Sequence, residues 1–175
     1  DRAYYQTEYR QAHSYQPGQY LSPRETFDLM RPEMDARELL FRQHIPSGAT
    51  VLEIGCGSGF FLDRLRKDYS VYGNEWNETD AAFVQDELSL PCSDADLSEA
   101  SPGQTFTAIC AFQVLEHVAD PLGWLRQVKN KLIGGGWLHL EVPNLDNALV
   151  SLFDIPAFRD FFFRKPHLQY FTLET

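Results

Sequence analysis

The sequence predicts an α/β fold with a Rossmann-like, doubly wound sheet, and three observations lead to this class. The apolar run from Val51 to Ile54 is typical of a buried parallel strand. Gly55, Gly57 and Gly59 follow it, and helical spacing of apolar residues resumes directly after them. Strand-like and helix-like segments then alternate, which is typical of right-handed β-α-β units. We therefore expect five parallel strands flanked by helices.

Composition limits the classes of function. The chain has 175 residues, enough for one domain with a substantial core. Its formal net charge is −10, so most of its surface would repel a polyanion, and we expect no nucleic-acid partner. No apolar run reaches the roughly 18 residues of a membrane span, and no signal-peptide pattern opens the sequence. We expect a cytoplasmic protein without a membrane partner.

The cysteines predict neither a metal site nor a disulfide. Cys56, Cys92 and Cys110 are scattered and lack the C-x-x-C spacing of metal and redox motifs. They are typical of reduced thiols in the cytoplasm, and we expect no metal ion.

The expected elements follow from local patterns. The helices before and after the glycines are expected at residues 32–45, 60–68 and 77–88, the last capped by Asn77. A later helix begins at Asp120-Pro121 and is expected to stop at Gly134-Gly135-Gly136. The remaining strands are expected at residues 70–75, within 90–97, at 105–112 and at 137–142.

The glycine turn and the acidic residue Glu75 predict a ligand site. Glycine permits positive φ in a tight turn and close approach of a ligand to the main chain. Glu75 ends the second strand, where an acidic side chain can accept both hydroxyls of a ribose. Phe60 stands where the dinucleotide fingerprint G-x-G-x-x-G needs a small residue, which weakens a nicotinamide or flavin interpretation. A nucleotide-dependent oxidoreductase stays open as a third alternative.

Three segments carry a family resemblance. Residues 53–59, Glu-Ile-Gly-Cys-Gly-Ser-Gly, resemble the first motif of class I S-adenosylmethionine-dependent methyltransferases. Residues 113–117, Gln-Val-Leu-Glu-His, resemble the "VLEH" segment of their small-molecule branch, the methyltransferase-11/23-like domains. Residues 167–175 resemble the segment that introduces the family's last helix.

The resemblance implies S-adenosylmethionine as cofactor and S-adenosylhomocysteine as product. Glu75 would bind the ribose, Trp76 would stack on adenine, and Asp96 would accept from the adenine amino group, with Asp94 as a competing candidate. Glu53 would compensate the positive charge of the cofactor. The complete set of cofactor-binding residues implied is Glu53, Gly55, Cys56, Gly57, Gly59, Glu75, Trp76, Asp96, Leu97, Phe112 and Gln113.

The sulfonium of this cofactor is itself the reactive electrophile, so the protein needs neither a nucleophile nor a metal. Where the acceptor carries a proton, a general base with a pKa near neutrality is useful, and His117 and His167 are the candidates. The alternative is that each histidine is structural, His117 fixing the start of a helix. Asn144 and Tyr170 are candidate substrate contacts.

The sequence divides into three expected parts. Residues 1–31 form a tyrosine-rich segment, either packed on the domain or serving as a lid; residues 32–144 form the cofactor-binding core. Residues 145–175 are rich in aromatics and are expected to face the substrate or a partner. The family fold would add a terminal antiparallel hairpin that this sequence lacks, so we expect a homodimer or intra-protein contact through this segment.

Two functions are therefore weighed. The first is a methyltransferase acting on a small-molecule acceptor. The second is a non-catalytic module of a larger protein that keeps the same fold for interaction.

Overall fold

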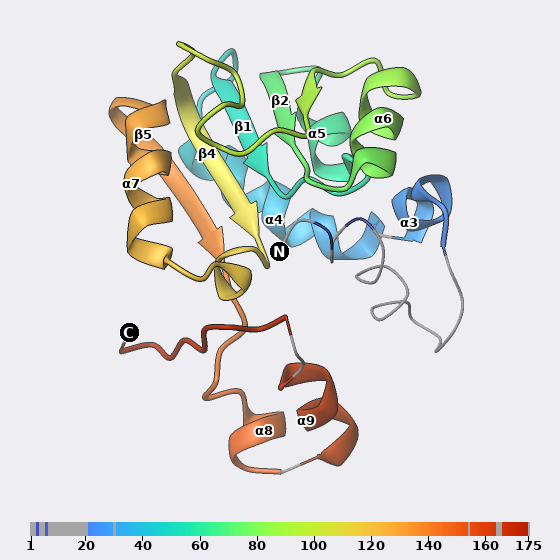
Figure 1. The fold of residues 1–175 in the computed structure, drawn as a ribbon, viewed down its shortest axis with the longest axis vertical. Helices are drawn as coiled ribbons and strands as arrows, with labels where there is room; N and C mark the ends of the chain where they lie inside the picture. Colours follow the sequence, from blue (N-terminus) through green and yellow to red (C-terminus); the bar gives the residue numbers. More distant parts are fainter. Residues whose placement is uncertain are drawn as a thin grey trace.

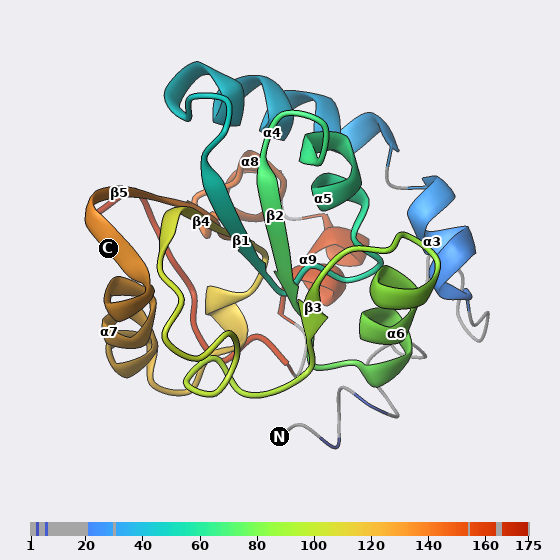
Figure 2. The same cartoon turned by 90° about the horizontal axis from the view of Figure 1, so that it is seen from above.

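The computed structural model describes residues 3, 6, 21–29, 31–153, 155–163 and 166–174. Their strands form one parallel sheet in the order β3-β2-β1-β4-β5 (Figures 1 and 2). The strands are β1 (Thr50–Ile54), β2 (Ser70–Asn74), β3 (Cys92–Ser93), β4 (Phe106–Phe112) and β5 (Leu132–Glu141). The predicted fold class and parallel sheet are confirmed.

Helices cover both faces of this sheet: α3 (Pro23–Leu29), α4 (Arg31–His44), α5 (Phe60–Leu65) and α6 (Glu78–Asp86) on one face, and α7 (Pro121–Lys131) on the other. Two further helices, α8 (Ala148–Ser151) and α9 (Pro156–Phe162), follow β5. A short 3₁₀ helix, η1 (Leu115–His117), follows β4. No helix of the described residues is long and apolar enough to cross a membrane.

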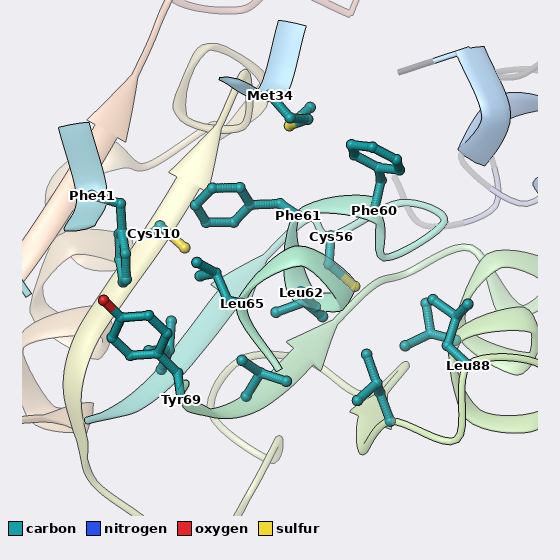
Figure 3. Packing of buried hydrophobic residues seen from close by; sticks show 14 of the residues in the cluster. Met34, Phe41, Cys56, Phe60, Phe61, Leu62, Leu65, Tyr69, Leu88 and Cys110 are labelled. Carbon is teal, nitrogen blue, oxygen red and sulfur yellow. The ribbon is translucent and has the colours of Figure 1, made fainter. Parts of the chain in front are cut away.

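Alternation along the strands creates two apolar layers. Val51, Val71 and Cys110 face α3, α4, α5 and α6, while Leu52 and Ile109 face α7. Aromatic rings fill the first layer: Phe41 lies edge-on to Phe61 and to Tyr69, at centroid distances of 5.7 Å and 5.5 Å (Figure 3). Strand β1 therefore lies buried on both sides, which fixes the glycine turn at its end.

The helix starts follow the predicted capping chemistry. The Asn77 side chain accepts hydrogen bonds from the backbone amides of Thr79 and Asp80, both at 3.1 Å. Asp120 accepts from the Gly123 amide at 2.9 Å, and Pro121 occupies the first turn. These side chains satisfy amides that the helix itself leaves without partners.

The expected boundary between α7 and β5 was wrong. The helix ends at Lys131, and residues 134–136, predicted to stop it, lie inside β5. The register explains this: Phe106 pairs with Leu132 whereas Ala108 pairs with Trp137, so the glycines form an irregularity opposite one residue of β4.

The aromatic segment after β5 folds at the carboxyl edge of the sheet. Helices α8 and α9 lie beyond the arrowheads of β4 and β5 (Figure 1). The chain then returns: Asn144 forms a parallel bridge with Phe171, and the Leu145 amide donates to the Phe171 carbonyl at 2.7 Å. The tyrosines proposed as a lid (Tyr4, Tyr5, Tyr9, Tyr15 and Tyr20) lie outside the described residues, and the three-part division stays a prediction.

Candidate functional site

The glycine turn joins β1 to α5 through three residues in the left-handed region. Gly55, Gly57 and Gly59 have φ of 70°, 51° and 76°. A Cβ on Gly55 would lie 2.5 Å from Cγ2 of Val114, so the turn packs directly on the segment after β4. A Cβ on Gly57 would meet nothing within 4 Å. Packing thus requires glycine at position 55, whereas Gly57 exposes its backbone to open space that a ligand can occupy.

The carboxylate of Glu75 lies against this turn. Its Oε2 accepts a hydrogen bond from the Gly57 amide at 2.9 Å, and its Oε1 accepts from the Asn77 amide at 2.8 Å. The two features that the sequence singled out therefore meet at one point, across the carboxyl ends of β1 and β2. Two hydrogen bonds from backbone amides hold the carboxylate in a fixed position.

Glu53 is a buried carboxyl inside the sheet next to the turn. It is 4% exposed, and its Oε2 has no hydrogen-bond partner among the described residues. Burial raises the pKa of Glu53 well above its usual value of 4.5, and the positive charge of Arg37 opposes that rise. A cationic ligand bound nearby would stabilise the carboxylate form.

A polar network of Arg37, Gln113 and Glu141, which the sequence analysis did not predict, lies on the β4–β5 side of the site. Arg37 of α4 forms an ion pair with Glu141, its Nε donating to Oε2 at 2.8 Å. Glu141 Oε1 also accepts from Gln113 Nε2 at 3.1 Å. Gln113 itself has φ of 58°, which is unusual for a residue other than glycine, and such strain is concentrated at functional sites. Residue 113 is therefore held from both its backbone and its side chain.

The residues expected to bind adenine differ in their position and exposure. Trp76 is 37% exposed beside Glu75, so its ring is accessible. Asp94 follows β3 directly and is half-buried, whereas Asp96 is exposed and its carbonyl accepts from the amides of Glu99 and Ala100 in a turn. Asp94 therefore lies nearer the strand end than Asp96, and the assignment of either residue to adenine stays a prediction. Leu97 is buried in the layer under α7.

Two residues predicted to touch the cofactor have side chains in the core. Phe112 packs edge-on to Phe61 at a centroid distance of 5.0 Å, with the Arg37 guanidinium 4.6 Å from its ring. The buried Cys56 Sγ lies 3.7 Å from Cys92 Sγ; this hydrogen bond and burial raise the thiol pKa of Cys56. Phe112 and Cys56 therefore offer a ligand their backbone.

One described residue of the N-terminal segment reaches the same edge. Gln6 Nε2 donates to the Trp76 carbonyl at 2.6 Å, and Gln6 Oε1 accepts from the Glu78 amide at 3.1 Å. The start of α6 is therefore covered by this residue.

The two candidate bases come together at the other end of the site. The rings of His117 and His167 are 5.0 Å apart between centroids. His117 Nδ1 lies 2.8 Å from the Pro166 carbonyl, and its Nε2 lies 3.9 Å from Oε1 of Glu116. The two candidate bases, 50 positions apart in the sequence, therefore lie side by side in the structure.

The candidate substrate contact Tyr170 lies on the returning chain, and Asn144 lies just after β5. Tyr170 is 38% exposed and stacks on Phe162, with ring centroids 6.0 Å apart. The Asn144 side chain accepts from the Asp146 amide at 3.0 Å, so it shapes the turn after β5. Tyr170 therefore presents the more accessible side chain to an acceptor.

These features define a class of protein. An open glycine backbone, a ribose-type carboxylate and a buried carboxyl lacking a partner among the described residues together fit an adenosyl ligand that carries positive charge. A parallel sheet of this order with such an edge fits a class I S-adenosylmethionine-dependent methyltransferase. S-adenosylmethionine is the cofactor of that class.

Comparison with known proteins gives the family. The model of a family described as "methyltransferase domain" matches residues 19–175, and the chain belongs to this family. It is 29% identical over 121 residues to the tRNA U34 carboxymethyltransferase of Haemophilus influenzae (strain PittEE), covering 64% of this chain and 37% of that protein. It is 31% identical over 101 residues to the ubiquinone biosynthesis O-methyltransferase of Parvibaculum lavamentivorans, covering 53% of this chain and 40% of that protein.

A solved structure shares the fold. The S-adenosylmethionine-bound amino pentose methyltransferase of Micromonospora echinaspora superposes with a TM-score of 0.58 at 21% identity. The match covers 74% of this chain and 59% of that chain. The chain thus spans well under two thirds of the length of each of these proteins.

Proposed function

We propose that the protein transfers a methyl group from S-adenosylmethionine to a small-molecule acceptor. The observation that carries this proposal is the hydrogen bond between Gly57 and Glu75, because it brings a bare backbone turn and a ribose-type carboxylate into one pocket. The matching methyltransferase family supports the reaction type.

The proposed cofactor side uses four kinds of contact. Backbone groups of the turn at Gly55 and Gly57 approach the methionine portion, and Glu75 accepts from the ribose hydroxyls. Trp76 stacks on adenine, and Glu53 compensates the positive charge of the ammonium and sulfonium groups. Burial strengthens this last interaction, because a charge pair is screened less away from water.

The proposed acceptor side is the edge formed by η1 and the returning chain. The cofactor supplies an electrophilic methyl group, and the protein holds the acceptor in line with it and excludes water. His117, His167 and Tyr170 lie together here and form the wall that meets the acceptor. The side chains of His117 and His167 are buried, so water has little access to this wall except at the exposed Tyr170.

A small acceptor is favoured over a nucleic acid by charge. The formal net charge of −10 opposes binding of a polyanion, although one relative is a tRNA-modifying enzyme by name. The ubiquinone-pathway O-methyltransferase and the amino pentose methyltransferase support a small acceptor with a hydroxyl or amino group.

The exposed apolar side chains of α8 and the loop after it support a further contact. Leu152 is 73% exposed and Phe153 64% exposed. We include in the proposal that this surface meets either a second copy of the chain or another part of the same protein.

The test is transfer of a labelled methyl group. Purified protein with methyl-tritiated S-adenosylmethionine is incubated with phenols, amino sugars and unmodified tRNA as separate pools. Label in either small-molecule pool supports the proposal, and label in tRNA alone contradicts the acceptor class. Tight cofactor binding with no transfer to any pool would favour the non-catalytic interaction module.

Substitutions of the two histidines test whether they form the side of the site that meets the acceptor. His117→Ala and His167→Ala should each lower turnover about 10²-fold while cofactor affinity stays within about twofold. His44→Ala, an exposed histidine at the end of α4, is the matched control. Unchanged turnover in both site variants would remove the pair from the reaction.

A further inference from the structure

Three side chains that can ligate a metal are gathered at the carboxyl end of β4. They are Glu116 and His117 of η1 and His167 of the returning chain, and one ligand atom from each lies within 4.8 Å of the other two. Glu116 is 0% exposed and His167 is 6% exposed, while the side chain of His117 is 7% exposed. The cluster is therefore enclosed by protein rather than spread over the surface.

Backbone hydrogen bonds hold the two halves of this cluster together. The Glu116 carbonyl accepts from the amides of Leu168 and Gln169, at 2.7 Å and 3.0 Å. His117 Nδ1 lies 2.8 Å from the carbonyl oxygen of Pro166. The residues on both sides of His167 are thus fixed to η1, and the cluster is arranged in advance of any ligand.

The contact with Pro166 determines how the His117 ring is used. A carbonyl oxygen only accepts, so Nδ1 is the ring nitrogen that carries hydrogen. In the neutral ring Nε2 then presents its lone pair, and it lies 3.9 Å from Oε1 of Glu116. Histidines that bind metals characteristically donate their other N–H to such a carbonyl.

The distances suit a shared ion. Ligand atoms about 2.0–2.2 Å from one metal are separated by roughly 3–4.4 Å, so small side-chain rotations close the cluster around it. Two imidazole nitrogens and one carboxylate oxygen are a ligand set that suits a divalent cation.

We propose that Glu116, His117 and His167 bind one divalent first-row transition-metal ion. Imidazole nitrogen selects ions such as Zn²⁺ over Mg²⁺ and Ca²⁺, which prefer oxygen ligands. Three protein ligands leave coordination positions open for a further oxygen. This proposal departs from the expectation of a metal-free site.

The position of the cluster suggests what the ion does, and this part rests on the proposed function. Val114, two residues before Glu116, packs against the glycine turn, so the ion would adjoin the cofactor pocket. Bound to the ion, an acceptor hydroxyl loses its proton to water more easily. Its oxygen then forms the bond to the methyl carbon as the carbon–sulfur bond breaks, and a thioether leaves.

The experiment measures Zn²⁺ binding in the absence of cofactor and acceptor. Untagged, chelator-treated, reduced protein is titrated with Zn²⁺ by calorimetry, and metal content is counted after gel filtration. We expect one tightly bound Zn²⁺ per chain and at least about 100-fold weaker binding in Glu116→Gln and His167→Ala, since loss of even an outer partner costs up to that factor. His139→Ala, a half-buried histidine of β5, should bind Zn²⁺ within about twofold of the wild type.

Folding and thiols are controlled separately. Each variant must retain the wild-type circular dichroism spectrum, and Glu116→Gln, which preserves the shape of the side chain, is decisive if His167→Ala unfolds. Cys92→Ala should leave the stoichiometry unchanged. Absence of Zn²⁺ binding by the folded wild type, or equal binding by Glu116→Gln, would overturn the site. Either result leaves the methyl-transfer test unaffected, so failure of the two proposals can be distinguished.

Discussion

The backbone amide of Gly57 donates a hydrogen bond to Oε2 of Glu75, with the two atoms 2.9 Å apart. The contact joins the turn after β1 to the residue after β2. Because Oε1 is held by the Asn77 amide, the carboxylate has one fixed orientation at the carboxyl edge of the sheet. This single residue therefore both supports the turn and is proposed to read the ribose.

The first prediction separates these two roles of Glu75. Glu75→Ala should weaken S-adenosylhomocysteine binding by about 1–3 kcal/mol, through lost charge-assisted bonds. The wild type should also prefer S-adenosylhomocysteine over its 2′-deoxy analogue, and the variant should lose that preference. Calorimetry with both ligands measures this. If the variant weakens both ligands equally, Glu75 only supports the turn. Glu87→Ala, at an exposed carboxylate, is the control.

The second prediction concerns the open backbone at Gly57. Gly57→Ala should cost about 1–2 kcal/mol of stability for its left-handed φ and should weaken cofactor binding about tenfold or more, because the added methyl enters the ligand space. Gly48→Ala is a matched control: Gly48 has φ of 84° and also has no neighbour within 4 Å, but it precedes β1 at the opposite edge. Equal cofactor affinity in the two variants would contradict the proposed pocket.

Gly55→Ala completes this comparison. Its Cβ would lie 2.5 Å from Val114, so overpacking adds about 1–3 kcal/mol to the backbone cost. Thermal unfolding should show the largest loss of stability for this variant.

Most of the fold could be predicted from local sequence patterns. The end of β1, the glycine turn, the caps at Asn77 and Asp120 and the position of Glu75 were all predictable, because each depends on residues close together in sequence. Strand β3 has two residues, too few to show a period, so the sequence pattern does not decide between Asp94 and Asp96. The start of β5 was misplaced because its glycines pair irregularly with β4.

The site was less predictable where it depends on distant residues. Arg37 and Glu141 meet across 104 positions, and neither stands in a motif. The meeting of His117 with His167 likewise depends on the chain returning after α9. The only local signal for the network was that Gln113 directly follows a strand, and its positive φ has no counterpart in the sequence.

The third prediction is a pH dependence caused by Glu53. Its folded pKa is raised, so the folded state binds more protons than the unfolded state; the stability from this group is complete below about pH 4.5 and is lost as pH rises through the raised pKa. In the absence of cofactor, Glu53→Gln should therefore gain stability over the wild type increasingly as pH rises from 5 to 8. Urea unfolding at several pH values measures the difference. Parallel curves for the two proteins would show that Glu53 carries no such penalty.

The same substitution should have the opposite effect on ligand binding. Neutral glutamine removes the charge that a sulfonium and an ammonium group would meet, so S-adenosylmethionine affinity should fall about tenfold, or about 1.4 kcal/mol. A variant that is more stable and yet binds more weakly would separate burial cost from ligand recognition.

The fourth prediction concerns Glu141, whose contribution to stability changes with pH in the opposite direction to that of Glu53. Its hydrogen bond from Arg37 holds the pKa of Glu141 below its usual value of 4.5, so the stability it contributes is present above about pH 4.5 and is lost as pH falls through the lowered pKa. Glu141→Gln should destabilise the protein near pH 7 by at most about 1 kcal/mol, because the carboxylate side chain is 37% exposed. That shifts the midpoint of thermal unfolding by about 2–4 °C. The difference from wild type should shrink progressively as pH falls below about 4.5, whereas a constant difference at every pH would assign the loss to packing around Gln113 rather than to the charge.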